Sequence, residues 1–259
     1  MLANTTYQKW LTVLLFIAVL GVNGLANGLP INGLTTGEVS DMYPNLFTPA
    51  SFTFGIWGLI YTGLLGYVLA FAFTKKSNLP SEKITLLWGV NAAANIAWIF
   101  AWHYLKTASS VAIMLILLLS LIWITTELRK VERPDKFTTY SRAAFELYFG
   151  WITVATIANV TALLVRYDLD LVVLSPEQWT ASIIVVAALV SAIVYLRGAS
   201  IWYLLPVLWA FYGIYARHES EWGFRGAYPL VMSTLKWTFS ALLLIVLARL
   251  VLQPGYKRT

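Results

Sequence analysis

Long apolar stretches alternate with short polar ones along most of the chain. Eight stretches are close to the 20 or so residues that a helix needs to cross a hydrocarbon layer of roughly 30 Å. They cover residues 10–29, 52–73, 84–104, 109–128, 143–165, 179–196, 201–216 and 230–252. The pattern predicts an all-α fold, a polytopic membrane helix bundle with eight transmembrane helices.

Two of these stretches are less regular than the rest. The seventh is short and contains Pro206, which removes one backbone donor from its middle. The first begins within ten residues of Met1, as a signal peptide would, but it contains Asn23 and Asn27 and lacks a small-residue cleavage motif. We therefore interpret both stretches as helices.

The composition agrees with a membrane protein and limits its chemistry. The chain is 59% hydrophobic and 12% charged, whereas soluble domains carry roughly 25% charged residues. It has no cysteine, which excludes disulfides, thiolate chemistry and cysteine-ligated metals. The two histidines, His103 and His218, offer few ligands for zinc or haem. We expect no metal site and no resident cofactor.

The basic residues are distributed unevenly between the two sets of connections. One set holds thirteen lysines and arginines and the opposite set holds four. The first set is Lys9, Lys75, Lys76, Lys83, Arg129, Lys130, Arg133, Lys136, Arg142, Arg197, Arg249, Lys257 and Arg258, and the second is Lys106, Arg166, Arg217 and Arg225. The positive-inside rule then predicts a multi-pass protein of the cell membrane with cytoplasmic N- and C-termini. The long loop of residues 30–51 would face outward.

Aromatic residues follow the long loop directly. In the stretch FTPASFTFGIWGLIY, residues 47–61, Phe54, Trp57 and Tyr61 are spaced i, i+3 and i+7. This spacing places three rings on one helix face below a proline-bearing loop, where a flat apolar ligand would be held. An aromatic belt at the membrane interface is an alternative explanation.

The third predicted helix carries a stripe of amides and indoles. Asn91, Asn95, Trp98 and Trp102 fall at i, i+4, i+7 and i+11, with Trp88 one turn earlier. Because an unsatisfied amide in hydrocarbon costs several kcal/mol, the stripe should face the bundle. Two roles remain open for the asparagines, ligand contacts or hydrogen bonds that join neighbouring helices.

The fifth predicted helix repeats this theme. Tyr148, Trp151, Ala155 and Asn159 share one face, and the small Ala155 would leave room for a ligand between its larger neighbours. Glu146 lies near the cytoplasmic end of the same helix. We expect it to snorkel or to pair with a basic side chain, and a proton relay is the alternative.

Three motifs together resemble those of one family. FTPASFTFGIWGLIY is similar to the loop and second helix of the TspO/MBR proteins, the tryptophan-rich sensory proteins related to the mitochondrial translocator protein. NAAANIAWIF (residues 91–100) and GWITVATIANVTALL (residues 150–164) resemble the third- and fifth-helix patterns of that family. The resemblance covers roughly residues 10–166. The chain departs from the family at its loop motif, where Phe47 replaces a tryptophan and Pro49 is followed by Ala50.

The resemblance implies a five-helix TspO-like domain over residues 1–166, followed by a three-helix membrane extension over residues 167–259. It also implies a pocket beneath the first loop that binds a porphyrin, another tetrapyrrole or a similar aromatic lipophile. With Phe54 added from its spacing, the expected ligand-binding residues are Pro49, Phe54, Trp57, Tyr61, Asn91, Asn95, Trp98, Trp151, Ala155 and Asn159. The expected partners are the lipid bilayer, the aromatic ligand and, as one possible assembly, a second copy in a homodimer. No nucleic acid is expected.

The favoured function is that of a sensor or carrier. The alternatives are a secondary transporter of a small solute, for which Pro206 and Lys236 are the few indications, and a light-dependent porphyrin-degrading enzyme. Lys236 lies inside the last predicted span, and Arg249, three residues before the end of the same span, is the other basic residue within a predicted span. A retinal Schiff base would need a counter-ion carboxylate that the middle of every predicted span lacks, and Lys236 lies near enough to the helix end to snorkel.

Overall fold

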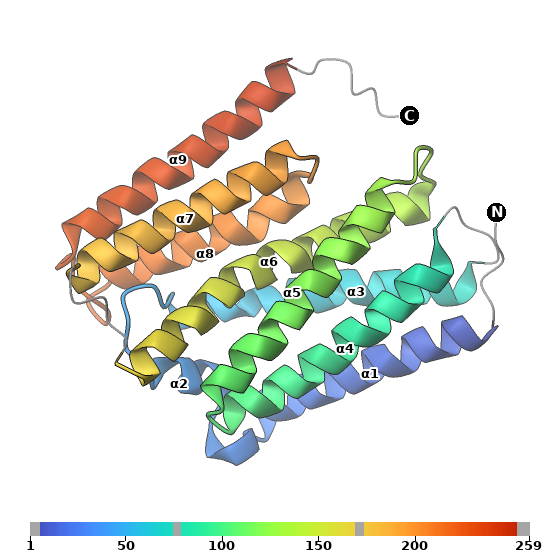
Figure 1. The fold of residues 1–259 in the computed structure, drawn as a ribbon, viewed down its shortest axis with the longest axis horizontal. Helices are drawn as coiled ribbons and strands as arrows, with labels where there is room; N and C mark the ends of the chain where they lie inside the picture. Colours follow the sequence, from blue (N-terminus) through green and yellow to red (C-terminus); the bar gives the residue numbers. More distant parts are fainter. Residues whose placement is uncertain (1–5, 75–78, 169–173, 253–259) are drawn as a thin grey trace.

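Helices and their connections form the whole of the described chain. The computed structural model describes residues 6–74, 79–168 and 174–252, with the helices arranged as in Figure 1. Their bounds are α1 (Thr6–Gly28), α2 (Thr36–Asp41), α3 (Ile56–Phe73), α4 (Ser81–His103), α5 (Thr107–Arg129), α6 (Lys136–Arg166), α7 (Pro176–Leu196), α8 (Ile201–Glu219) and α9 (Pro229–Leu252), with 3₁₀ turns η1 (Ile31–Gly33) and η2 (Ser51–Gly55). The predicted all-α membrane bundle is confirmed.

One predicted helix start is wrong by seven residues, and another lies in a 3₁₀ turn that precedes its α-helix. The fifth predicted helix begins at Lys136 rather than Ala143, because the Asp135 side chain accepts a hydrogen bond from Thr138 N at 2.7 Å and caps the helix seven residues earlier. The second predicted helix, α3, begins at Ile56, since the preceding residues form the 3₁₀ turn η2. Phe54 therefore lies in that turn, next to Trp57 at the start of α3.

Seven helices in the described ranges are long and apolar enough to cross a membrane, and α8 does not meet that criterion. Helix α8 nevertheless extends over the same depth of the bundle as its neighbours α7 and α9. At one end of the bundle, Leu230 N of α9 donates to Glu177 Oε1 of α7 at 2.7 Å, and at the other, Arg249 Nη1 of α9 donates to Tyr195 O of α7 at 2.6 Å. Helices α7 and α9 therefore run parallel, and α8 must return between them.

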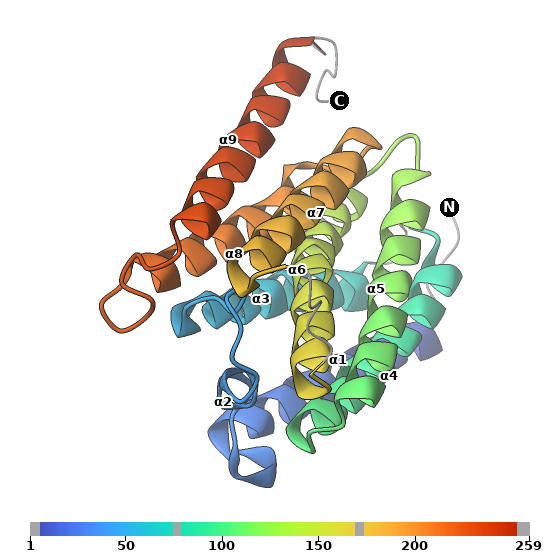
Figure 2. The same cartoon turned by 60° about the vertical axis from the view of Figure 1, so that its left-hand side comes forward.

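Five of the helices close a ring. Each of α1, α4, α5, α6 and α3 packs against the next, and α3 closes the ring by packing against α1. Helix α6 also packs against α8, while α9 packs against α7 and α8 (Figure 2). The long helix α6 therefore joins the five-helix ring to the last three helices.

The contact between α6 and α8 is a close approach of two backbones. Gly150 of α6 faces the carbonyl oxygen of Tyr203 on α8, and a β-carbon at Gly150 would overlap this oxygen. Glycine is required here because it has no side chain, not because of its backbone angles. The position of α8 thus depends on one missing methyl group.

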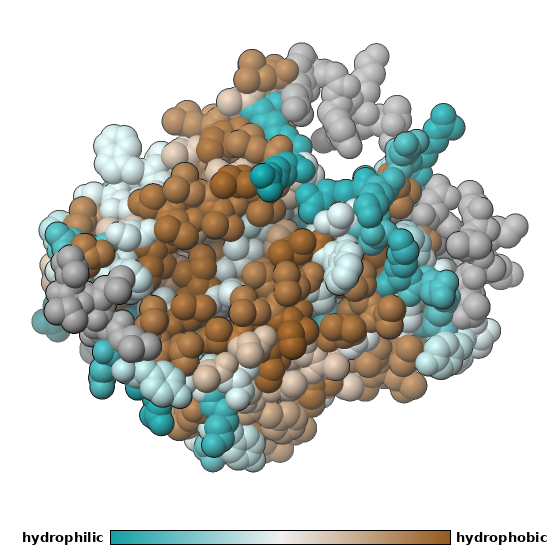
Figure 3. All heavy atoms as spheres, viewed as in Figure 1, coloured by the Kyte–Doolittle hydropathy of each residue, from teal (hydrophilic) through white to brown (hydrophobic). Residues whose placement is uncertain are grey.

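Basic side chains gather at one end of the bundle, which we call the basic end. Lys9 Nζ of α1 donates to Thr74 O at the end of α3 at 2.7 Å, and Lys83 of α4 pairs with Glu127 of α5 at 3.4 Å. In Figure 3 hydrophilic atoms cluster at the upper right, beyond a broad apolar band. This end contains the described residues of the predicted cytoplasmic set. Lys75, Lys76, Lys257 and Arg258 lie outside the described residues.

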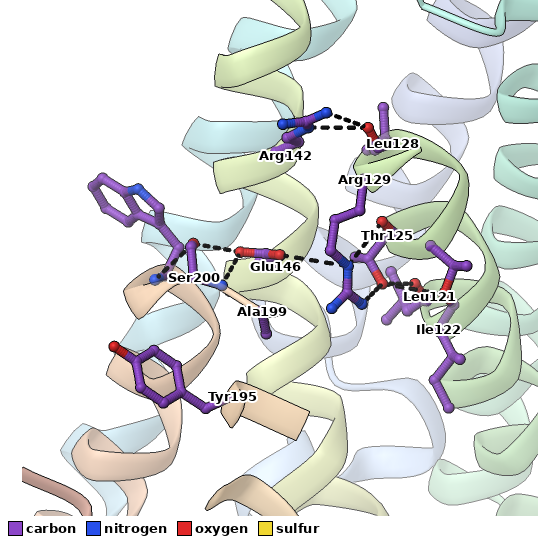
Figure 4. A network of polar contacts seen from close by, with 12 residues as sticks. Leu121, Ile122, Thr125, Leu128, Arg129, Arg142, Glu146, Tyr195, Ala199 and Ser200 are labelled. Atoms are coloured by element: carbon purple, nitrogen blue, oxygen red, sulfur yellow. Dashed lines mark hydrogen bonds and ion pairs between the residues drawn. The ribbon is translucent and has the colours of Figure 1, made fainter. Parts of the chain in front are cut away.

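Glu146 lies in a polar network near this basic end (Figure 4). It is almost completely buried, its carboxylate lies 3.9 Å from Arg129 Nε of α5, and it accepts a hydrogen bond from the Ser200 backbone N at 2.9 Å. The Ser200 hydroxyl also donates to Glu146. Because Ser200 is the N-cap of α8, the buried carboxylate links α5, α6 and the start of α8. The expected pairing with a basic side chain is confirmed.

Candidate functional site

Two adjoining cavities lie at the end of the bundle opposite to the basic end. The first holds about 70 Å³ and is surrounded by the loop of residues 30–50, α3, α4, α6 and α8. The second holds about 470 Å³ and lies between the same loop, α1, α3 and α4. Thr36, Phe54, Trp57 and Trp98 line both. The volume of the second cavity, taken by itself, falls within the roughly 300–1,000 Å³ typical of small-molecule sites.

Aromatic rings from three helices line the walls of these cavities. Trp57 stacks on Tyr61 with ring centroids 5.4 Å apart and meets Trp151 edge-on at 6.1 Å. On α4, Trp98 stacks on Trp102 at 5.8 Å. Three helices thus present indole faces and edges to the same space, an arrangement that suits a flat apolar ligand.

Eight of the ten predicted ligand residues line these cavities. They are Pro49, Phe54, Trp57, Tyr61, Trp98, Trp151, Ala155 and Asn159. The structure therefore brings together residues from the loop, η2, α3, α4 and α6 that are up to 110 positions apart in the sequence. Whether they bind a ligand stays a prediction.

The other two, Asn91 and Asn95, line neither cavity. Asn91 Nδ2 donates to Ser120 Oγ of α5 at 2.8 Å. Asn95 Nδ2 donates to Tyr148 Oη of α6 at 2.8 Å, and its oxygen accepts a hydrogen bond from Asn23 Nδ2 of α1 at 2.7 Å. These bonds join neighbouring helices, which is the second of the two roles considered for this stripe.

Three hydrogen-bond donors on the wall of the first cavity have no partner in the described structure. They are Trp98 Nε1, Trp151 Nε1 and Asn159 Nδ2, all on buried residues. Asn159 is held in place because its oxygen accepts a hydrogen bond from Ser110 Oγ at 2.9 Å. A buried donor without a partner costs about 1–3 kcal/mol of stability. A ligand that accepts hydrogen bonds from these groups would remove this cost and so bind more tightly.

The loop of residues 30–50 covers both cavities, and we call it the lid loop. On the α4 side, the buried His103 lies between two lid groups, with its Nδ1 3.1 Å from Ile31 O and its Nε2 3.1 Å from Thr36 Oγ1. Trp102 Nε1 donates to Thr36 O at 3.2 Å. The short helix α2 starts with a capping box formed by Thr35 and Glu38. The lid loop is therefore an ordered element tied to α4.

Helix α8 holds the opposite side of the lid loop. Ala50 N donates to Gly213 O at 3.0 Å, and Arg217 pairs with Asp41 at 3.0 Å. Ala210 and Ile214 of α8 also line the first cavity. The site therefore includes part of the segment beyond residue 166, which the sequence analysis did not assign to it.

Some lining residues had only a weak signal in the sequence. Asn23 and Asn27 of α1 line the second cavity, and their i, i+4 spacing in an apolar helix is the pattern that identified the α4 stripe. Thr36 and Asn45 of the lid loop follow no periodic pattern. Ala210 and Ile214 are ordinary helix residues, so nothing in the sequence distinguishes them from packing residues.

His218, near the end of α8, bonds this helix to the lid loop. Its Nε2 donates to Leu46 O at 2.9 Å, and its Nδ1 has no partner in the described structure. Burial lowers the pKa of His218 below the ordinary 6.5, an effect that Arg217 reinforces, while the bond to Leu46 O and the charge of Glu177 act in the opposite direction. The imidazole is therefore neutral in the folded protein at neutral pH.

We expect the folded protein to lose stability as the pH falls below 6.5. The unfolded chain takes up a proton on His218 near its ordinary pKa of 6.5, whereas the folded protein does so only at lower pH. The contribution of His218 to the free energy of unfolding is therefore complete above pH 6.5, and it is lost as the pH falls through the pKa of His218 in the folded protein. Thermal unfolding in detergent between pH 7.5 and 5 measures it. His218→Gln, which keeps an amide donor for Leu46 O, should reduce this dependence, and an unchanged pH profile would contradict the assignment.

Comparison with known proteins gives one finding. A family model described as TSPO-like protein matches residues 9–251. This range includes α7, α8 and most of α9 as well as the five-helix ring. The division of the chain into two domains at residue 166 stays a prediction. Neither the curated proteins nor the solved structures contain a match to the chain.

Proposed function

Because the chain belongs to the family of TSPO-like proteins, we propose that it binds a planar aromatic lipophile, a tetrapyrrole or a molecule of similar shape, beneath the lid loop. In this proposal it acts as a sensor or carrier in the cell membrane, with both termini in the cytoplasm. The helices long and apolar enough to span a membrane and the clustering of basic side chains at one end support this placement.

The observation that carries the proposal is the composition of the cavity wall. The indoles of Trp57, Trp98 and Trp151 offer stacking surfaces. Among the described residues that line the first cavity, the buried polar groups without a partner are N–H donors. A planar ring with carbonyl, carboxylate or ring-nitrogen acceptors matches both features, because stacking supplies affinity and the donors orient the ring.

The lid loop gives a route by which binding could be signalled. It contacts the cavities through Thr36, Asn45 and Pro49, and it is bonded to both α4 and α8. A bound ring that displaced the lid would change these bonds at the surface of the bundle. A sensor would use this change as its output, whereas a carrier would use it to admit and release the ligand.

Titration with protoporphyrin IX in the dark tests the proposal. We expect saturable quenching of tryptophan fluorescence, and affinities about tenfold weaker for Trp151→Phe and Asn159→Ala, since each loses a donor at the wall. Trp57→Phe should reduce the quenching amplitude, because it removes a stacked indole beside the cavity. Purified protein in detergent micelles suits the measurement.

Trp123→Phe is the matched control, because Trp123 is 62% exposed on α5, away from both cavities. Its affinity should equal that of the unmodified protein. Absence of saturable binding, or equal affinities for all four variants, would contradict the proposal. Illumination of the complex then separates a sensor or carrier, which leaves the porphyrin absorbance unchanged, from a porphyrin-degrading enzyme, which bleaches it.

A further inference from the structure

A groove between α8 and α9 lies apart from the cavities under the lid loop. It holds about 330 Å³ and is lined by Phe211, Tyr212 and Tyr215 of α8 and by Leu235, Lys236, Phe239 and Ser240 of α9. Apart from Lys236, the tyrosine hydroxyls and Ser240, its wall is apolar. The groove opens outward, since the Tyr212 side chain is 52% exposed.

Lys236 is the only charged residue of this groove. Its Nζ lies 5.3 Å from the centre of the Tyr215 ring, and no carboxylate of the described residues lies within 4.0 Å of it. Cations and aromatic faces attract each other, so this contact holds the ammonium group across the groove. The ammonium group therefore has no carboxylate partner among the described residues.

The depth of the ammonium group matches the boundary between lipid headgroups and acyl chains. Tyr215 lies one turn before the last residue of α8, which at 1.5 Å per residue is about 6 Å from the helix end. Trp237, next to Lys236, is 77% exposed, and exposed tryptophans gather at the membrane interface. From this level the groove continues past Phe239 and Ser240 toward the middle of α9.

We infer that this groove binds an anionic phospholipid of the surrounding bilayer. The phosphate pairs with the Lys236 ammonium group at the headgroup boundary, and one acyl chain lies along Phe211 and Phe239. Charge complementarity selects the anionic headgroup, and the apolar wall below the lysine selects the chain. The site is independent of the ligand cavity, because none of its lining residues lines either cavity under the lid loop.

Native mass spectrometry of the full chain tests this inference. The protein is released from micelles that contain equal amounts of phosphatidylglycerol and phosphatidylcholine with identical chains. We expect one phosphatidylglycerol molecule to be retained preferentially. Lys236→Met should lower its occupancy about tenfold, while Lys236→Arg should keep it, because the charge is preserved. Ser240→Trp should also lower it by filling the groove without changing the charge.

Lys106→Met is the control, since Lys106 is an exposed cation at the lid end of the bundle on a different helix connection. It should retain phosphatidylglycerol as the unmodified protein does. Equal retention of both lipids, or a loss in Lys106→Met equal to that in Lys236→Met, would overturn the inference. Retention of added palmitate in place of phosphatidylglycerol would overturn the assignment to a phospholipid. Ser240→Trp and Lys236→Arg keep the inference testable if Lys236→Met fails to fold.

Discussion

Replacing Gly150 by alanine is expected to lower the free energy of unfolding by about 3 kcal/mol. The added methyl group would overlap the carbonyl oxygen of Tyr203, so α6 and α8 must separate. This oxygen belongs to the backbone of a helix and has no flexible side chain that could move aside. The midpoint of thermal unfolding, followed by tryptophan fluorescence in detergent, measures the loss.

The same change should weaken ligand binding, although Gly150 lines neither cavity. Movement of α8 would displace Ala210 and Ile214 from the cavity wall and strain the bond between Ala50 N and Gly213 O. Gly58→Ala is the control, because a β-carbon at Gly58 of α3 would meet no atom within 4 Å. If both alanine variants unfolded at the same temperature, the close approach of α6 and α8 would not matter for stability.

Replacing Ala155 by phenylalanine should abolish most binding at the proposed site. Ala155 lines the first cavity between Trp151 and Asn159, and a phenyl ring there would fill the space that a planar ligand needs. We expect the affinity for protoporphyrin IX to fall about a hundredfold, since a steric clash in a pocket is an effective means of exclusion. The change should cost little stability, because the ring enters a cavity rather than a packed core.

Ala97→Phe provides the matched control for this experiment. Ala97 is exposed on α4, one position before Trp98, so the same added ring would point away from the bundle. Its affinity and unfolding temperature should match those of the unmodified protein. A variant Ala155→Phe that bound protoporphyrin IX with unchanged affinity would place the ligand outside the first cavity.

Among the last three helices, α8 has a direct structural role in the candidate site. Gly213 O and Arg217 hold the lid loop, and a β-carbon at Gly213 would overlap Thr53, so α8 also lies directly against η2. Glu146 fixes the start of α8 through Ser200 at the opposite end of the helix. Helix α8 therefore connects the lid loop to a buried ionic network near the basic end.

Local properties of the sequence were sufficient to predict the helices and much of the candidate site. The length and apolarity of each stretch determine which segments can cross a membrane, and the 3.6-residue period determines which side chains share a face. Trp98 and Trp151 could therefore be assigned to the bundle interior without knowledge of their neighbours, whereas an aromatic belt remained the alternative for Trp57. The start of α6 was missed because Asp135 caps a polar, charged turn that has no apolar pattern.

Only the tertiary structure decided which helix each inward face meets. Asn95 and Asn159 have the same chemistry and similar helical settings, yet Asn95 bonds to Asn23 and Tyr148, whereas Asn159 keeps a free donor at the cavity. The contribution of α8 was equally hidden, because Ala210 and Ile214 acquire their role from contact with α6 and the lid loop. Periodicity describes one helix at a time, whereas a cavity forms where several helices fail to fill the space between them.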